Sequence, residues 1–242
     1  MIRLAKQKNK QKIREMWKIC FNDSEKFMDL YFSEKYRNEN TLIYFEGNQA
    51  VASLQILPYQ FTFCNEEIPV SYISGACTLP EYRNRGIMNK LLPAAFELMY
   101  ERKIPLSILI PAKPWLYDYY ARYGYEKVFS ADKNEIPLLT ILQNSGNDLD
   151  IAYAKFDKLF RQKDFCVQKT KADFVTIVRD AELDNFPPNG NLSGMARVID
   201  AEKLLAIFAR KYPKKELVFQ NQNDLCRLLF ENQQPTMNLM LE

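Results

Sequence analysis

The chain has 242 residues, 47% of them hydrophobic and 26% charged, which is the composition of a folded globular protein of one or two domains and excludes a disordered chain. Its 33 basic and 30 acidic residues leave a formal net charge of +3, too small a positive field to indicate nucleic acid or an anionic membrane as the main partner. The sequence contains no histidine, which excludes Ser-His-Asp triads, histidine general bases and zinc sites built on imidazole.

The N-terminal segment predicts two short helices. Ile13, Met16 and Trp17 lie at helical spacing and predict a helix over 10–21. Basic side chains are frequent from Arg3 to Lys18, and we interpret them as the solvated face of this helix. The polar run 22–24 then offers N-cap oxygens for a second helix, whose apolar face includes residues of 27–32.

Strand character begins near residue 41 and continues to residue 79. Alternating and continuous apolar runs separated by turn residues predict three antiparallel strands, over 41–45, 50–63 and 69–79.

Helices and strands then alternate. We expect a helix, a strand, a helix and a strand in that order, over 85–102, 106–110, 115–123 and 125–129. Pro93 should kink the first of these helices, because its ring removes an internal hydrogen bond. Gly124 ends the second.

The second half predicts a separate region that begins near residue 140. Its expected elements are a helix over 149–160, a break at 185–190, a strand over 195–199 and a helix capped by Asp200 that stops at Tyr212-Pro213. A candidate strand over 217–219, a last helix capped by Asp224 and a packed terminal strand over 237–242 complete the chain.

The cysteines indicate the compartment. They are odd in number and form no CxxC pair, at positions 20, 64, 77, 166 and 226. No stretch approaches the ~20 apolar residues that span a bilayer, and the N-terminus lacks the apolar core of a signal peptide. We therefore expect a cytoplasmic protein with no membrane partner.

One glycine lies where chemistry is expected. Gly86 follows two arginines at the junction between an apolar strand and an amphipathic helix. Exposed N–H groups at such a helix start, together with the helix dipole, form a site for a pyrophosphate. The alternative is a plain turn in which Gly86 relieves a steric clash and the arginines are solvated.

The segment around Gly86 resembles a known family. A strand, Pro-x-Tyr-Arg-x-Arg-Gly-Ile, a helix, a strand and Tyr-x-x-x-Gly-Tyr are similar to the core of the GCN5-related N-acetyltransferases (GNAT), whose phosphate loop reads Gln/Arg-x-x-Gly-x-Gly/Ala. Met88 stands where the family has a small residue, as in the branch of the enhanced-intracellular-survival type, to which 109–112 and 119–125 are also similar. The resemblance covers residues 1 to about 130. It implies an α/β (α+β) fold with a mixed, mostly antiparallel central sheet flanked by helices, plus a smaller α+β C-terminal domain.

The resemblance also implies a site for acetyl-CoA as cosubstrate, without a metal. The backbone of residues 76–78 would pair with the pantetheine arm, and one of its N–H groups would polarise the thioester carbonyl. The loop 84–89 would wrap the pyrophosphate, with two arginines adding charge. The implied cofactor-binding residues are Ala76, Cys77, Thr78, Arg83, Asn84, Arg85, Gly86, Ile87, Met88 and Asn89.

Two catalytic residues follow from the same resemblance. Tyr120, which precedes Gly124 by one helical turn, lies where the family places the phenol that protonates the departing thiolate; the alternative is a core position in an aromatic cluster. In the branch named above a C-terminal carboxylate serves as base, so the α-carboxylate or side chain of Glu242 is a candidate, the alternative being a solvated strand end with water relaying the proton. Cys77 has no base to activate it, and we expect a small strand residue there rather than a nucleophile.

The C-terminal segments are similar to the sterol-carrier-like domain that ends the same branch. Those relatives carry a second acetyltransferase-like domain in between, for which this chain leaves only 140–194. We expect a GNAT domain at 1–138, a connecting helical remnant at 139–194 and a shortened sterol-carrier-like domain at 195–242, which we interpret as a packing wall rather than a lipid site.

The expected function is acetyl-CoA-dependent N-acetyl transfer to a primary amine, small molecule or peptide, by direct attack without an acyl-enzyme. A non-catalytic acyl-CoA-binding or ligand-sensing protein is the main alternative, motivated by the missing histidine and by the absence of an acid on the central strand. A scaffold with a vestigial cofactor site is the third. The oligomeric state is left open.

Overall fold

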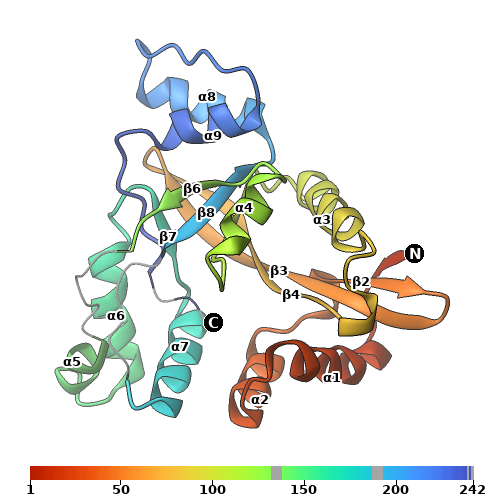
Figure 1. Ribbon diagram of the computed structural model, residues 1–242. Coiled ribbons are helices and arrows are strands. Elements are labelled where there is room, and N and C mark those ends of the chain that lie inside the picture. Colours follow the sequence, from red (N-terminus) through yellow and green to blue (C-terminus); the bar gives the residue numbers. More distant parts are fainter. Residues whose placement is uncertain (132–137, 187–192, 239, 241–242) are drawn as a thin grey trace. The chain divides into compact units, whose positions relative to one another are not determined.

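The computed structural model describes residues 1–131, 138–186, 193–238 and 240 (Figure 1). The chain divides into two compact units, one formed by Met1–Pro58 with Ser71–Arg102 and the other by Tyr59–Val70 with Lys103–Glu242. Two long strands, β3 (Gln49–Phe63) and β4 (Glu66–Thr78), contribute residues to both.

The first unit contains the predicted pair of helices and the start of the predicted strands. Its strands follow the order β1-β2-β3-β4, with antiparallel β1–β2 and β2–β3 pairings. Its further elements are β1 (Ile2–Leu4), α1 (Lys10–Phe21), α2 (Glu25–Glu34), β2 (Thr41–Glu46), α3 (Met88–Glu101) and short 3₁₀ helices at Gln7–Asn9, Asn38–Asn40 and Pro80–Tyr82. The two helices and three strands predicted up to residue 79 are confirmed. The sequence analysis missed β1, because so short a strand with a central arginine carries no detectable period.

Local capping explains how α1 and α2 are separated. Asn22 adopts the left-handed conformation (φ 60°) and ends α1. The hydroxyl of Ser24 accepts a hydrogen bond from the backbone N–H of Phe27 at 3.1 Å and starts α2. Both helices bury an apolar face, and the rings of Trp17 and Tyr31 lie 4.5 Å apart between centroids.

Helix α3 begins at Met88, later than the start predicted at residue 85. Asn84 and Gly86 have positive φ angles of 61° and 68°, a conformation that a right-handed helix cannot include. The kink expected at Pro93, which lies inside α3, stays a prediction.

The second unit also combines strands and helices. Its strands are β5 (Leu106–Leu109), β6 (Glu126–Phe129), β7 (Cys166–Gln168) and β8 (Gly194–Val198). Its helices are α4 (Trp115–Ala121), α5 (Leu138–Gln143), α6 (Leu149–Phe160), α7 (Lys171–Leu183), α8 (Ala201–Lys211) and α9 (Gln222–Phe230). The strands and helices expected near 106–129, at 149–160 and from 195 to 212 are confirmed, and the side chain of Asp200 caps α8 as predicted.

Strand β8 lies between β5 and β6, although α5, α6, β7 and α7 separate it from β6 in the sequence. Its register is antiparallel on both sides, with Ala196 opposite Ile108 and also opposite Glu126. The C-terminal segment therefore completes the sheet that β5 and β6 begin. The limits expected for the three domains, at 138 and 194, stay predictions.

Two predictions in the C-terminal segment are wrong. Residues 217–219 form no strand, because Val218 is 87% exposed and has no neighbouring strand to pair with among the described residues. Helix α9 is capped by Asn221, whose Oδ1 accepts from the N–H of Asp224 at 2.9 Å, so Asp224 lies in the first turn rather than at the cap.

The tail is packed, but only in part as a strand. Thr236 forms an isolated parallel bridge with Cys166, and Met237 and Asn238 are fully buried. The predicted break at 185–190 falls mostly, and Glu242 wholly, outside the described residues.

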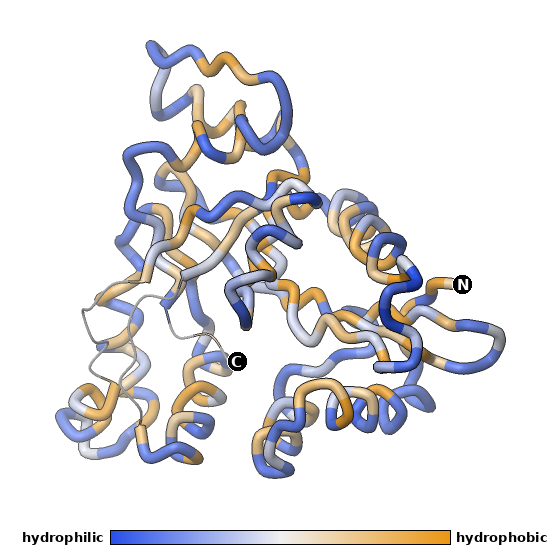
Figure 2. Tube along the Cα trace, viewed as in Figure 1, coloured by the Kyte–Doolittle hydropathy of each residue, from blue (hydrophilic) through white to orange (hydrophobic). Residues whose placement is uncertain are grey.

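The fold class agrees with the prediction. The strands with a defined register pair in antiparallel fashion, and helices cover them, α3 contacting β2 in the first unit and α9 contacting β8 in the second. Hydrophobic and hydrophilic residues alternate along the helices in Figure 2, as expected for helices that bury one face.

Candidate functional site

The segment between β4 and α3 is an exposed loop with two anchored ends. At its start, the N–H of Leu79 donates to the carbonyl of Val51 at 2.9 Å, and Leu79 is buried. At its end, Ile87 is buried and accepts hydrogen bonds from the N–H groups of Lys90 and Leu91. Residues 83–86 between these anchors are exposed.

The backbone of this loop presents donors without acceptors. Among the described residues, the N–H groups of 84–88 donate to no protein atom. Asn84 and Gly86 are left-handed, and a Cβ on Gly86 would meet only the Nδ2 of Asn89, at 3.8 Å. Backbone conformation therefore favours glycine at this position, while the space beside it stays open. N–H groups gathered by left-handed residues at a helix start form a concave site for an anion.

The two arginines of the loop differ in their partners within the protein. The guanidinium of Arg85 lies 4.9 Å from the ring centroid of Tyr82, donates to the carbonyl of Glu81 at 2.8 Å and lies 3.6 Å from a carboxylate oxygen of Glu46. Arg83 donates through Nε to the carbonyl of Thr78 at 3.1 Å and forms no ion pair within the part of the chain that the structure describes. Among the described residues no carboxylate neutralises the charge of Arg83, which also lies close enough to Cys20 to lower the pKa of that thiol.

The strand before the loop carries Ala76, Cys77 and Thr78. Cys77 is 4% exposed, and its sulfur lies 3.5 Å from the hydroxyl of Ser53, which agrees with the small strand residue expected there. The carbonyl of Thr78 accepts from the Sγ of Cys20 at 3.5 Å as well as from Arg83. The structure therefore brings the last residues of β4 and the first arginine of the loop together.

Cys20 is a residue that the sequence analysis missed. A side-chain hydrogen bond with Cys77, reinforced by the guanidinium of Arg83, lowers the pKa of the Cys20 thiol to about 7. Cys20 and Cys77 lie far apart in the sequence, and no spacing or motif joins them. Only the packing of α1 near the end of β4 brings the Sγ of Cys20 to the carbonyl of Thr78, at 3.5 Å.

Tyr120 lies on α4 in the second unit. Its side chain is 9% exposed, and burial, with a smaller contribution from Tyr123, raises the pKa of the phenol to about 12. Its ring contacts Tyr125, whose hydroxyl is paired with Ser107 at 2.6 Å. The hydroxyl of Tyr120 has no hydrogen-bond partner among the described residues. Some polar side-chain atoms of these residues are both unpaired and fully buried, but the Tyr120 hydroxyl does not belong to that group. Tyr120 is therefore both a core residue, as the alternative predicted, and a protonated phenol whose hydroxyl is not fully buried.

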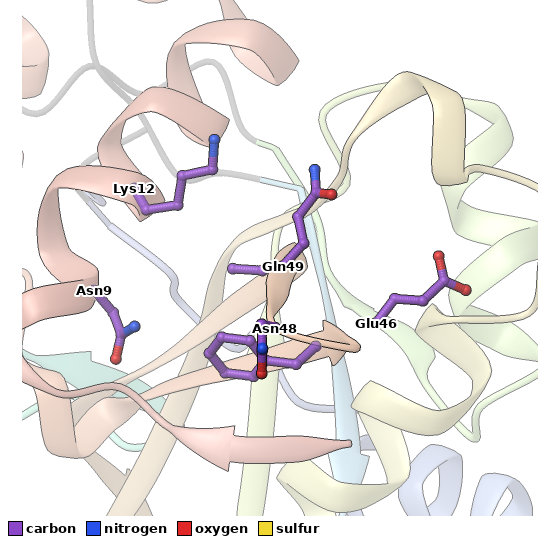
Figure 3. Close-up of a pocket in the computed structure, with 7 residues that line it drawn as sticks. Asn9, Lys12, Glu46, Asn48 and Gln49 are labelled. Carbon is purple, nitrogen blue, oxygen red and sulfur yellow. The ribbon is translucent and has the colours of Figure 1, made fainter.

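A surface cavity of about 630 Å³ lies beside the turn between β2 and β3. Figure 3 shows Asn9 and Lys12 on one side of it and Glu46 on the other. Two of its residues also hold the loop described above, because Gln49 accepts from the hydroxyl of Tyr82 at 3.1 Å and Glu46 pairs with Arg85. The cavity adds polar groups near the loop but no nucleophile.

Two general properties complete the description. Within the described residues, no helix has the length and apolar character that crossing a membrane requires. In that same part of the chain, His, Cys, Asp and Glu side chains form no group of three placed to hold a metal ion.

Comparison with known families gives one match. Residues 1–128, just over half of the chain, match the family described as acetyltransferase (GNAT) domain. No curated protein matches the sequence.

Solved structures with the same fold are known. A GCN5-related N-acetyltransferase from Anabaena variabilis is 23% identical with a TM-score of 0.57, over 73% of this chain and 47% of that one. A conserved protein from Enterococcus faecalis, described as a probable N-acyltransferase, is 14% identical with a TM-score of 0.59, over 82% and 51%. A GCN5-related N-acetyltransferase from Kribbella flavida is 15% identical with a TM-score of 0.53, over 82% and 54%. The chain spans about half the length of these proteins, and the likeness shows the fold.

Proposed function

Because the chain belongs to the GNAT acetyltransferase family, we propose that it binds acetyl-CoA and transfers the acetyl group to a primary amine by direct attack. The observation that carries this proposal is the loop 84–88, whose N–H groups have no acceptor among the described residues. A pyrophosphate supplies the acceptor oxygens and negative charge that such a loop, at the start of a helix, stabilises.

Arg83 would neutralise part of the charge of the pyrophosphate. It is exposed and fixed by its hydrogen bond to Thr78. The backbone of residues 76–78 would run beside the pantetheine arm, and one of its N–H groups would stabilise negative charge on the thioester oxygen as the amine attacks. The thioester supplies an activated acetyl group, so no acyl-enzyme is needed.

Tyr120 would act as general acid. The departing thiolate leaves more readily when protonated, and a phenol whose pKa is raised to about 12 keeps its proton at neutral pH. The unpaired hydroxyl supports this role, because other tyrosines of the same cluster use theirs within the protein: Tyr125 with Ser107, and Tyr119 with Tyr123.

The assignment of the base that deprotonates the amine rests on the family resemblance alone. Glu242 is the candidate, and the burial of Met240 and Asn238 in the second unit supports a packed tail. A water relay is the alternative. Replacing Glu242 with Gln should abolish the acidic limb of the pH–rate profile if the side chain is the base. An unchanged profile would exclude the side chain, and residues appended after Glu242 then test the α-carboxylate.

The finer assignment is to the enhanced-intracellular-survival type, with residues 195–242 similar to its sterol-carrier-like domain. Met88 at the end of the loop supports it, since a bulky residue there distinguishes that branch. The acceptor class, an amine on a small molecule or a peptide, belongs to the same proposal.

A non-catalytic acyl-CoA-binding protein is the second candidate. It is favoured by one observation: the last residues of β4, 71–78, carry no carboxylate that could serve as base. Such a protein would bind the cofactor through the same loop but release no CoA.

Release of free CoA thiol in the presence of a panel of amines tests the proposal. Replacing Tyr120 with Phe should lower kcat about 100-fold or more, while the Kd for acetyl-CoA stays within about twofold. Tyr119→Phe is the matched control, because it removes a neighbouring phenol that is paired with Tyr123. Equal turnover of the two variants would exclude Tyr120 as the acid, and no turnover by the wild type with any amine would favour the binding protein.

A further inference from the structure

The open cavity beside the turn between β2 and β3 has no role in the proposed function (Figure 3). All of its lining residues belong to the first unit. Its volume of about 630 Å³ is more than a single ion needs and lies within the usual range of small-molecule sites, about 300–1,000 Å³. The lining consists of two apolar residues and five polar or charged ones: Phe45 and Ala50, and Asn9, Lys12, Glu46, Asn48 and Gln49.

The polar side chains of the lining present more free donors than free acceptors. The Oδ1 of Asn9 accepts from the backbone N–H of Lys6 at 2.9 Å, so the Nδ2 is the free group of this amide. The Oε1 of Gln49 accepts from Tyr82 at 3.1 Å, and its Nε2 donates to no atom among the described residues. The amide of Asn48 has no side-chain partner in that part of the chain. A ligand rich in hydrogen-bond acceptors therefore matches this lining.

The balance of charge in the lining is positive. The ammonium of Lys12 lies 3.5 Å from a carboxylate oxygen of Glu15, and both side chains are about half exposed. An exposed ion pair of this kind is weak, so Lys12 can turn to a ligand at little cost. The carboxylate of Glu46 lies 3.6 Å from the guanidinium of Arg85, which offsets its charge. A negatively charged ligand is therefore favoured.

Positive charge also accumulates next to the cavity along the chain. Residues 1–12 contain five basic side chains and no acidic one, and Lys12 is the last of the five. The guanidinium of Arg3 lies 5.9 Å from the ring centroid of Phe45, which lines the cavity. Lys8 is exposed and forms no ion pair among the described residues. Basic residues at the start of a helix oppose its dipole, so the stability of α1 does not explain this segment.

The remaining features of the lining fit a nucleoside. Phe45 and Ala50 give an apolar surface, and aromatic side chains stack with any nucleobase. The amides of Asn48 and Gln49 carry both donors and acceptors, as the edges of a base do, and the carboxylate of Glu46 accepts from ribose hydroxyls.

We propose that this cavity binds a nucleoside that carries a phosphate monoester, with the phosphate held by Lys12 and Asn9 and the base against Phe45. A phosphate monoester has between one and two negative charges at neutral pH and three strong acceptor oxygens. It therefore uses both the free donors and the positive charge of the lining.

Two molecules share this chemistry. One is the nucleotide end of acetyl-CoA, whose pyrophosphate would lie on the loop 84–88. The cavity and this loop are neighbours in the first unit, because Glu46 pairs with Arg85 and Gln49 with Tyr82. This source rests on the proposed function. The other is a free nucleotide, which does not depend on it.

Titration of the full-length protein with adenosine 3′,5′-bisphosphate tests the site. Lys12→Met removes the ammonium and keeps an unbranched side chain, and it should weaken binding at least tenfold. Lys8→Met is the matched control, because it removes one charge of the same basic segment but lies outside the lining. The absence of saturable binding at millimolar nucleotide, or equal affinities of Lys12→Met and Lys8→Met, would overturn the proposal.

Asn48→Asp is a second variant of the lining. The change adds a negative charge at an exposed turn position and keeps the shape of the side chain, so it should weaken binding at least tenfold in a folded protein. Thermal melts check the fold of each variant. Binding that falls in Gly86→Asp but not in Asn48→Asp would place the nucleotide on the loop 84–88 and overturn the proposal.

Acetyl-dephospho-CoA, which lacks the 3′-phosphate, distinguishes the two sources. If the cavity holds the nucleotide end of acetyl-CoA, the wild type should bind acetyl-CoA at least tenfold more tightly than the dephospho form, and Lys12→Met should remove this preference. If it holds a free nucleotide, the bisphosphate should bind to protein already saturated with acetyl-CoA. An unchanged preference in Lys12→Met, together with no such additional binding, would overturn the proposal.

The same titrations separate this inference from the proposed function. If the protein binds the bisphosphate in a manner that depends on Lys12 but binds no acetyl-CoA, the proposed function fails and the inference stands with a free nucleotide as ligand. If it binds acetyl-CoA equally well in the wild type and Lys12→Met and leaves the bisphosphate unbound, the inference fails and the proposed function stands.

Discussion

Trp17 lies so close to Gly75 that a Cβ on this glycine would come within 2.1 Å of Cζ3 of the indole. The indole is fixed on its other side, because its Nε1 donates to Asp23 at 2.5 Å and its ring lies 4.5 Å from that of Tyr31. Gly75 also has a φ of 56°. The contact holds α1 against β4 directly before residues 76–78.

Replacing Gly75 with Ala should therefore destabilise the protein through two effects. The left-handed backbone costs about 1 kcal/mol, and the overlap with Trp17 adds about 1–3 kcal/mol. Gly47→Ala is the matched control, since Gly47 has a φ of 57° but nothing within 4 Å of its Cβ position. Urea unfolding measures both variants, and equal losses would show that the indole moves aside without cost.

The reactivity of Cys20 should depend on pH with a midpoint near 7. The folded-state pKa of about 7 lies below the ordinary value of 9.0, so the thiolate is the favoured form and reaction with iodoacetamide should reach its plateau by about pH 8. Cys77→Ala removes the largest cause of the lowering and should move the midpoint upward. Mass spectrometry of the alkylated peptide gives the rate of reaction at Cys20 at each pH. A midpoint near 9 in both the wild type and Cys77→Ala would contradict this cause of the lowered pKa.

The stability of the protein should respond to Asp180 on α7. Burial, and then the charge of Asp184, raise the pKa of Asp180 to about 6 from its ordinary 3.8. A raised pKa means that the folded state prefers the protonated form, so the stability that Asp180 contributes is fully present below pH 4 and is lost as the pH rises through 6.

Asp180→Asn should therefore match the wild type near pH 4 and exceed its unfolding free energy by about 1 kcal/mol at pH 7.5, after allowance for solvent screening. Urea unfolding at the two pH values is the measurement. A variant that is less stable than the wild type at pH 7.5 would show that the carboxylate has a stabilising partner.

The sequence predicts the elements whose causes are local. The stripe of α1, the alternation of β2 and β3 and the side-chain cap at Asp200 each depend on neighbouring residues, and the structure has them close to the expected limits. The phosphate loop around Gly86 was expected from the resemblance, but its left-handed residues were not: the predicted helix began at residue 85, whereas Gly86 has a φ of 68° and α3 begins at Met88.

Long-range relationships were not predictable in the same way. Strand β8 inserts between β5 and β6 although a strand and three helices intervene in the sequence, and no pattern in residues 194–198 specifies that partner. The hydrogen bond from Cys20 to the carbonyl of Thr78 likewise arises only when α1 packs near the end of β4. The strand predicted at 217–219 fails for a related reason. A short apolar run forms a strand only when a partner strand lies beside it.

Binding of acetyl-CoA to the loop 84–88 is the central claim, and a calorimetric titration of the reduced protein tests it most directly. Gly86→Asp adds a side chain and a negative charge where the pyrophosphate would lie, and Gly146→Asp is the control, a left-handed glycine with nothing within 4 Å of its Cβ position. We predict saturable binding by the wild type and the control and at least a 30-fold weaker affinity in Gly86→Asp. No binding by the wild type, or equal affinity in all three proteins, would contradict the assignment of this loop as the cofactor site.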